Sequence, residues 1–168
     1  MSLLTAPFTT RKTAVLAALT LALTGCATTA QGPANLADSL GQQPALSTFN
    51  SLAAKSGLAE TLKAAGPYTV FAPTNDAFKA VPAATMDDLS KHPEKLKAVL
   101  SYHVVMGMTP ATAVKNGNVK SLEGSNLGLG KAGDYVTVEN AAVVTADLKA
   151  SNGVIHTIDT VLLPPKKK

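Results

Sequence analysis

Apolar residues recur at spacings of three and four from Pro44 to Val105, which is typical of short amphipathic helices. One apolar face ends at Gly57, a residue that commonly stops a helix. Another begins at Pro93, which suits a first helical position, and leads directly into Tyr102. This half of the chain therefore predicts several short helices.

A strand interrupts these helices. Residues 68–73 (Tyr-Thr-Val-Phe-Ala-Pro) are rich in β-branched and aromatic side chains and end at a proline. Thr74 is the predicted N-cap of the next helix, because its hydroxyl can accept from a free N–H of the first turn. Asn75 and Asp76 place polar and acidic groups in that turn, where the helix dipole favours them. Further on, Thr85 followed by Asp88 resembles a capping box.

Beyond Gly107 the pattern changes to short strands divided by glycine- and asparagine-containing turns. A short helix is predicted over residues 109–115 before this region. Residues 151–153 (Ser-Asn-Gly) form a predicted turn, and the apolar run that follows predicts a buried strand closed by Pro164. Helices first and strands later, without regular alternation, indicate the α+β class.

Three motifs in this order resemble the fasciclin domain family. They are the blocks 68–78 and 151–164, and the Tyr102-His103 pair between them. The resemblance covers roughly residues 35–165. It implies a fasciclin-like β-sandwich or wedge with several short helices packed at one side, and it points to a binding or adhesion module.

The amino-terminal residues predict export. Arg11 and Lys12 precede an apolar run over residues 13–24, which is shorter than the roughly 20 residues of a membrane span. The run ends in Leu-Thr-Gly before Cys26, the only cysteine of the chain. One interpretation is an ordinary signal peptide cleaved later, for instance after Ala30. The favoured interpretation is a lipoprotein signal, because the order of residues resembles a lipobox, with acyl chains on Cys26 as the anchor.

This interpretation divides the chain into four predicted parts. They are a lipoprotein signal peptide (1–25), a lipidated cysteine with a spacer (26–34), a fasciclin domain (35–165) and a basic tail (166–168). The predicted location is that of an exported, membrane-anchored lipoprotein at the outer membrane or cell surface, or facing the periplasm.

Charge excludes one large class of partners. Without Arg11 and Lys12, 13 lysines remain against 11 acidic residues, and no arginine remains. Nucleic-acid readers depend on a basic stripe and on arginine for bidentate contacts. We therefore expect no nucleic-acid binding. The expected partner is an unidentified protein or polysaccharide, and the domain is expected to be a monomer.

Two short elements are candidates for recognition, and each has a structural alternative. Tyr102 and His103 match the family's Tyr-His pair, which is implicated in integrin binding in animal members. The apolar neighbours of His103 favour a buried histidine that bonds to backbone groups. Asp147 and Leu148 resemble the family's Asp-Ile adhesion element, although a turn-binding aspartate and a core leucine would explain them equally.

The remaining signature residues are interpreted as structural. In the closing strand a period of two places His156 on one face with Val154 and Ile158, as a core or rim residue. The full structural set is Thr74, Asn75, Asp76, Asn152, Gly153, His156 and Asp159.

No arrangement of residues points to catalysis. The three histidines lack metal-ligand spacing, no Gly-x-Ser-x-Gly elbow occurs, and no phosphate-binding glycine loop follows a strand. We therefore predict no catalytic residue, no metal and no cofactor. The sequence favours a surface-tethered, non-catalytic adhesion module that contacts cells, matrix or polysaccharide. The alternative is a binding protein for a hydrophobic small molecule held in a cleft.

Overall fold

The computed structural model describes residues 34–165 of the 168-residue chain. The predicted signal peptide, Cys26 and the basic tail lie outside the described residues. The helices are α1 (Leu36–Gly41), the 3-10 helix η1 (Pro44–Leu46), α2 (Ser47–Lys55), α3 (Leu58–Lys63), α4 (Asn75–Lys79), α5 (Ala83–Lys91) and α6 (Pro93–Tyr102). The strands are β1 (Tyr68–Pro73), β2 (Val104–Met106), β3 (Gly117–Lys120), β4 (Asn126–Ala132), β5 (Tyr135–Val138), β6 (Ala141–Ala150) and β7 (Gly153–Ile158).

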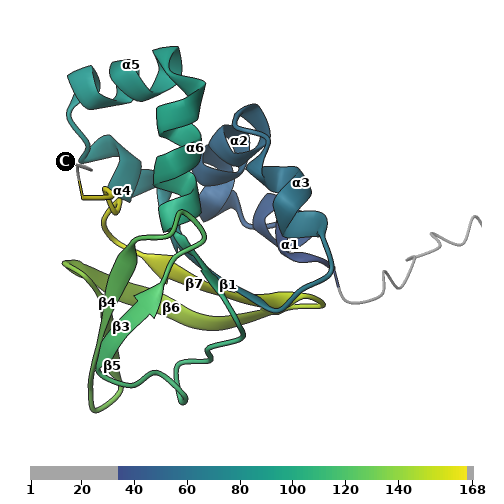
Figure 1. Cartoon of the computed structure of the whole chain (residues 1–168), viewed down its shortest axis with the longest axis vertical. Coiled ribbons are helices and arrows are strands. Elements are labelled where there is room, and N and C mark those ends of the chain that lie inside the picture. Colours follow the sequence, from purple (N-terminus) through teal and green to yellow (C-terminus); the bar gives the residue numbers. More distant parts are fainter. Residues whose placement is uncertain (1–33, 166–168) are drawn as a thin grey trace, which may run out of the picture. The chain divides into compact units, whose positions relative to one another are not determined.

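The strands form a seven-stranded sheet in the order β2-β1-β7-β6-β5-β4-β3. The β1–β7 pair is parallel and the other pairs are antiparallel. The two outer strands meet again, because Val105 forms a bridge with Ser121 and the Leu122 N–H donates to Val104 O at 2.6 Å. The sheet therefore curls into the predicted wedge, with the helices gathered on one side (Figure 1).

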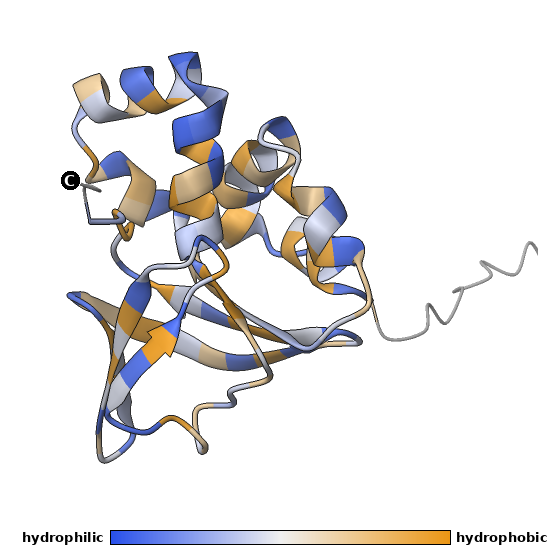
Figure 2. Ribbon diagram, viewed as in Figure 1, coloured by the Kyte–Doolittle hydropathy of each residue, from blue (hydrophilic) through white to orange (hydrophobic). Residues whose placement is uncertain are grey.

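The wedge has a separate apolar core on each face of β1 and β7. Val70 and Ile155 face the helices and pack with residues such as Phe49. Phe71 and Ile158 face the opposite way, into the space enclosed by β3, β4 and β5. This alternation follows from the period of two along a strand. Along β3 to β5 apolar residues alternate with polar or small ones, as expected when one face of the strands is buried (Figure 2).

The strand-to-helix junction after β1 is as predicted, whereas the start of α5 is not. The Thr74 hydroxyl accepts from Ala77 N–H at 3.3 Å and caps α4. Helix α5 already begins at Ala83 after Pro82, so Thr85 lies inside its first turn and not at a capping box. The N-cap residue is Pro82, whose side chain has no polar atom, so the cap has no side-chain bond.

The helix predicted over residues 109–115 is also wrong, since these residues form turns. Their path is set by contacts with distant strands. The Thr69 hydroxyl donates to Gly107 O at 2.7 Å and accepts from Thr109 N–H at 2.9 Å. Gly107 has a φ of +102°, a left-handed value that favours glycine. Residues 107–116 are called the strap below, because they connect β2 to β3 and bond to side chains of β1, β4, β6 and β7.

The strands β1 and β7 have two distinct ends. At the hairpin end, Tyr68 pairs with both Met106 and Gly153. At the exit end, Pro73 pairs with Ile158, and the chain continues to Pro165. The yellow tip of the β6–β7 hairpin marks the first end in Figure 1.

Candidate functional site

His103 lies in the core between α6 and the segment that follows β7. Its side chain is completely buried. Nδ1 lies 2.7 Å from Val99 O, and Nε2 lies 3.0 Å from Leu162 N. Because the Leu162 N–H requires a lone pair, Nε2 is the acceptor and Nδ1 carries the proton that is donated to Val99. His103 therefore joins α6 to the carboxy-terminal segment and presents no polar atom to a partner.

Burial also keeps this imidazole neutral. Loss of hydration lowers the pKa of His103 to about 4, and the bond to Val99 O opposes this shift only in part. The ring also contacts Phe49 edge-on, with 6.0 Å between ring centres. The geometry thus agrees with the structural interpretation of this residue.

Tyr102 differs from its neighbour because it borders a cavity. The ring is buried, and its hydroxyl lies 3.0 Å from Asn126 O and 3.3 Å from Glu139 Oε1. Burial, together with the nearby Glu139 charge, raises the pKa of Tyr102 to about 12, so the phenol stays protonated. A cavity of about 240 Å³ adjoins it. This cavity is lined by Tyr102, Asn126, Glu139, Asn140, Leu162, Leu163 and Pro165.

Asp147 lies within β6 at a bulge. Its backbone has a φ of +60°, and its Oδ1 accepts from the Ala111 N–H of the strap at 2.9 Å. Leu148 is half-buried and packs against the helix-side core. Both residues therefore have the structural role offered as their alternative, although Asp147 also borders an open cleft.

His156 connects β7 to both the strap and the bulge. It is buried and stacks on Phe71 at 5.4 Å between ring centres. Nε2 lies 2.9 Å from Thr109 O, and Nδ1 accepts from the Asp147 N–H at 3.3 Å. His156 and Asp147 are thus brought together by the fold. The side chains of Tyr102 and His103 instead bond to the backbone of Asn126, Val99 and Leu162.

Lys131, in β4, binds the strap. Its Nζ donates to Ala111 O at 2.8 Å, while Asp147 accepts from the N–H of the same residue. The strap is therefore fixed to β4 and β6 by side chains of opposite charge. Sequence reasoning missed Lys131, because its partner lies 20 residues away in a segment that looked helical.

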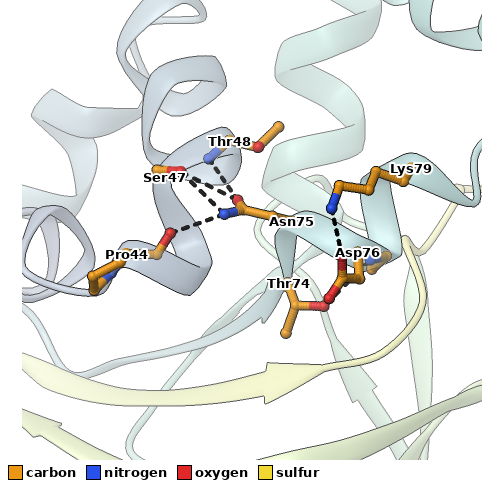
Figure 3. A network of polar contacts seen from close by, with 8 residues as sticks. Pro44, Ser47, Thr48, Thr74, Asn75, Asp76 and Lys79 are labelled. Atoms are coloured by element: carbon orange, nitrogen blue, oxygen red, sulfur yellow. Dashed lines mark hydrogen bonds and ion pairs between the residues drawn. The ribbon is translucent and has the colours of Figure 1, made fainter.

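The first signature block joins α4 to the helix layer (Figure 3). Asn75 Oδ1 accepts from the Thr48 N–H at 3.0 Å, and its Nδ2 donates to Pro44 O at 2.8 Å. Asn75, the first residue of α4, therefore accepts from a backbone N–H of the first turn of α2 that has no partner within that helix. Asp76 forms an exposed ion pair with Lys79 at 2.8 Å.

The second block fixes β7 at its start. Asn152 accepts from the Leu36 N–H at 2.8 Å and donates to the carbonyl oxygens of Leu62 (2.7 Å) and Ala64 (2.9 Å). A Cβ on Gly153 would lie 2.0 Å from the Tyr68 carbonyl oxygen, so no side chain fits there. At the other end of β7, Asp159 is exposed and accepts from the Ala142 N–H at 2.9 Å.

Two kinds of feature are absent from the described part of the chain. Among residues 34–165, no three histidine, cysteine, aspartate or glutamate side chains lie close enough to hold a metal ion. In the same range, no helix has both the length and the apolar composition needed to cross a membrane.

Residues 44–164 match the fasciclin domain. The chain belongs to the fasciclin family. Protein sll1483 of Synechocystis sp. is 49% identical over 123 residues, covering 70% of this chain and 68% of that protein. Cell surface glycolipoprotein MPB83 of Mycobacterium bovis is 39% identical over 143 residues, covering 81% and 62%. Transforming growth factor-beta-induced protein ig-h3 of Sus scrofa is 44% identical over 117 residues, covering 67% of this chain but 16% of its own length.

A solved structure shares the fold. The FAS1 domain pair of fasciclin I, an insect cell adhesion molecule, superposes with a TM-score of 0.58 and 24% identity, covering 73% of this chain and 46% of the pair. The fasciclin fold expected from the motifs is therefore confirmed. The named relatives include a cell-surface protein and an adhesion molecule.

Proposed function

We propose that this fasciclin protein is a non-catalytic interaction module, tethered to a membrane through acyl chains on Cys26. The main support is the use of its signature side chains. Asn75, Asn152 and His103 direct their polar atoms to backbone groups of the domain itself. Such bonds build a rigid surface, and they leave the His103 imidazole unavailable for acid–base chemistry.

Tethering makes weak contacts effective. Many copies on one surface raise the avidity by orders of magnitude without a stronger individual site. The relatives support this setting, since one is named a cell surface glycolipoprotein and another is a cell adhesion molecule. We therefore propose adhesion to a neighbouring cell, a matrix component or a polysaccharide.

The test compares the attachment of densely coated beads with the competition by soluble monomer. Beads densely coated with the full chain should attach to cells, and soluble monomer should compete poorly. Beads coated with Gly153→Val protein, which cannot keep the β1–β7 pairing, serve as the unfolded control. Equal attachment of both bead types would refute the adhesion proposal.

The anchor needs its own test. Cys26→Ser should move the protein from the membrane fraction to a soluble or unprocessed one, because the thiol that carries the acyl chains is lost. A variant that fractionates like the wild type would refute the anchor while leaving the adhesion test intact.

One observation supports the second candidate, the binding of a hydrophobic small molecule. A groove of about 550 Å³ lies between α5, α6 and the carboxy-terminal segment. Its apolar lining consists of Leu89, Ala98, Val99, Leu163, Pro164 and Pro165. The helix–sheet interface itself is filled by the core, so a ligand would have to use this peripheral groove. Leu163→Asp, at an exposed residue of the groove, should abolish uptake of an apolar dye if the groove is used, and unchanged uptake would exclude it.

A further inference from the structure

Two methionines are exposed where β2 ends. Met106 and Met108 are 64% and 54% exposed, and they make up two of the five large apolar side chains that are more than half exposed in residues 34–165. Gly107 separates them at a positive φ, so the chain turns between them. Exposed apolar side chains that occur together mark contact sites more often than single ones do.

These methionines lie at the hairpin end of the sheet. Met106 pairs with Tyr68, which also pairs with Gly153 at the start of β7. Met108 borders a cleft of about 380 Å³ beside the β6–β7 hairpin. The Ser151 N–H donates to Ala34 O at 2.9 Å, so the first described residue lies at the same end.

The length of the preceding segment limits how far this end can be from a bilayer. An acylated Cys26 would be followed by eight residues before Asn35. Eight extended residues span at most about 30 Å. The hairpin end is therefore the part of the domain that the tether holds nearest the lipid.

We propose that the hairpin end rests on the phospholipid surface, with Met106 and Met108 inserted at the headgroup–acyl boundary. The proposal rests on the lipid tether of the proposed function. Flexible, apolar methionine side chains suit such a contact, because they adapt to an irregular surface. Binding would be driven by burial of apolar side chains in the interface.

Charges at this end do not favour one class of headgroup. The carboxylates of Asp38, Glu60 and Asp147 are opposed by the ammonium groups of Lys63, which pairs with Glu60, and of Lys149. Lys149 is exposed and has no ion-pair partner within residues 34–165, so it is free to contact a lipid phosphate. The near balance of charge predicts similar contact with zwitterionic and anionic bilayers.

The absence of tryptophan from the chain provides a clean test. Single substitutions Met106→Trp and Met108→Trp are made in the full lipidated protein, which is reconstituted into phosphatidylcholine vesicles. Val144→Trp is the matched control, because Val144 is similarly exposed (63%) but lies at the exit end of β7, where its neighbour Val143 pairs with Ile158. Met106→Trp and Met108→Trp should show blue-shifted emission and quenching by shallow spin-labelled lipid, and Val144→Trp should show neither.

Vesicle flotation separates the two hypotheses. Protein that fails to float refutes the tether and this inference with it. Protein that floats, but whose Met106→Trp and Met108→Trp emission matches that of Val144→Trp, refutes the orientation alone. Replacing part of the phosphatidylcholine with phosphatidylglycerol should leave the quenching unchanged. An increase confined to the anionic vesicles would refute apolar insertion in favour of lysine contacts.

Discussion

The two ends of β7 are held in different ways. At the hairpin end, the Asn152 amide bonds to two helices, and Gly153 lies against the β1 backbone with no space for a side chain. At the exit end, the side chain of the exposed Asp159 accepts one hydrogen bond from β6, and His103 holds the segment beyond it. The same signature block therefore contains residues that packing makes irreplaceable and others that only terminate a strand.

Gly153→Ala is expected to have the largest effect. The new Cβ would lie 2.0 Å from Tyr68 O and 2.9 Å from Leu36 Cδ1, so the β1 backbone must move. We expect a loss of about 4 kcal/mol or more in the free energy of unfolding. Urea denaturation measures this loss, and Gly133→Ala is the control.

Gly133 has a φ of +62°, but a Cβ at this position would have no atom within 4 Å. Its replacement should therefore cost only about 1 kcal/mol, from backbone strain alone. If both variants lost the same free energy of unfolding, close packing would not be the reason why position 153 requires glycine.

The exit end should respond to acid through His103. The pKa of this residue is about 4 in the fold, below its ordinary value of 6.5, so the unfolded chain binds the proton more readily. Stability is therefore full above pH 6.5 and falls as the pH drops to about 4, by on the order of 3 kcal/mol.

Urea midpoints measured from pH 7.5 to pH 4 test this dependence. His103→Gln, which removes the titrating group, should be less stable at pH 7.5 but should change less with pH. His92 and His156 remain in both proteins, so the difference isolates His103. Parallel pH profiles would contradict the assignment.

Asn152→Ala is expected to have an intermediate effect. It leaves the Leu36 N–H and the Leu62 and Ala64 carbonyls without their partner, which should lower the free energy of unfolding by about 1–3 kcal/mol. Hydrogen exchange should rise first in α1. Asn140→Ala, at the turn before β6, is the control and should change stability by no more than about 0.5 kcal/mol.

Asp159→Ala is expected to have the smallest effect. The residue is exposed, and the bond that it accepts from Ala142 can be replaced by water. A loss of about 0.5–1 kcal/mol in thermal or urea unfolding is expected, and Asp159→Asn should restore most of it because the amide oxygen still accepts. A loss as large as that of Asn152→Ala would mean that the two ends are held equally.

Local chemistry accounts for what the sequence predicted well. The Thr74 cap, the strand before it and the burial of His156 each follow from neighbouring residues and strand periodicity. The resemblance to the fasciclin family added the wedge, which no local pattern specifies.

Long-range contacts account for what the sequence missed. The strap looked helical, but Thr69, His156, Asp147 and Lys131 hold it in turns from four different strands. Helix α1 has only six residues, and Asn152 bonds to its first N–H from 116 positions away. Short segments of this kind depend on distant partners more than on their own propensity.

The bridge between Val105 and Ser121 has a consequence for the dense display proposed for this domain. Sheets with long free edges tend to pair with one another, and this tendency grows with local concentration. Here the two outer strands are short and meet each other, and the bulge at Asp147 interrupts the long strand β6. A domain closed in this way can be displayed in many neighbouring copies while its strands stay paired within their own chain.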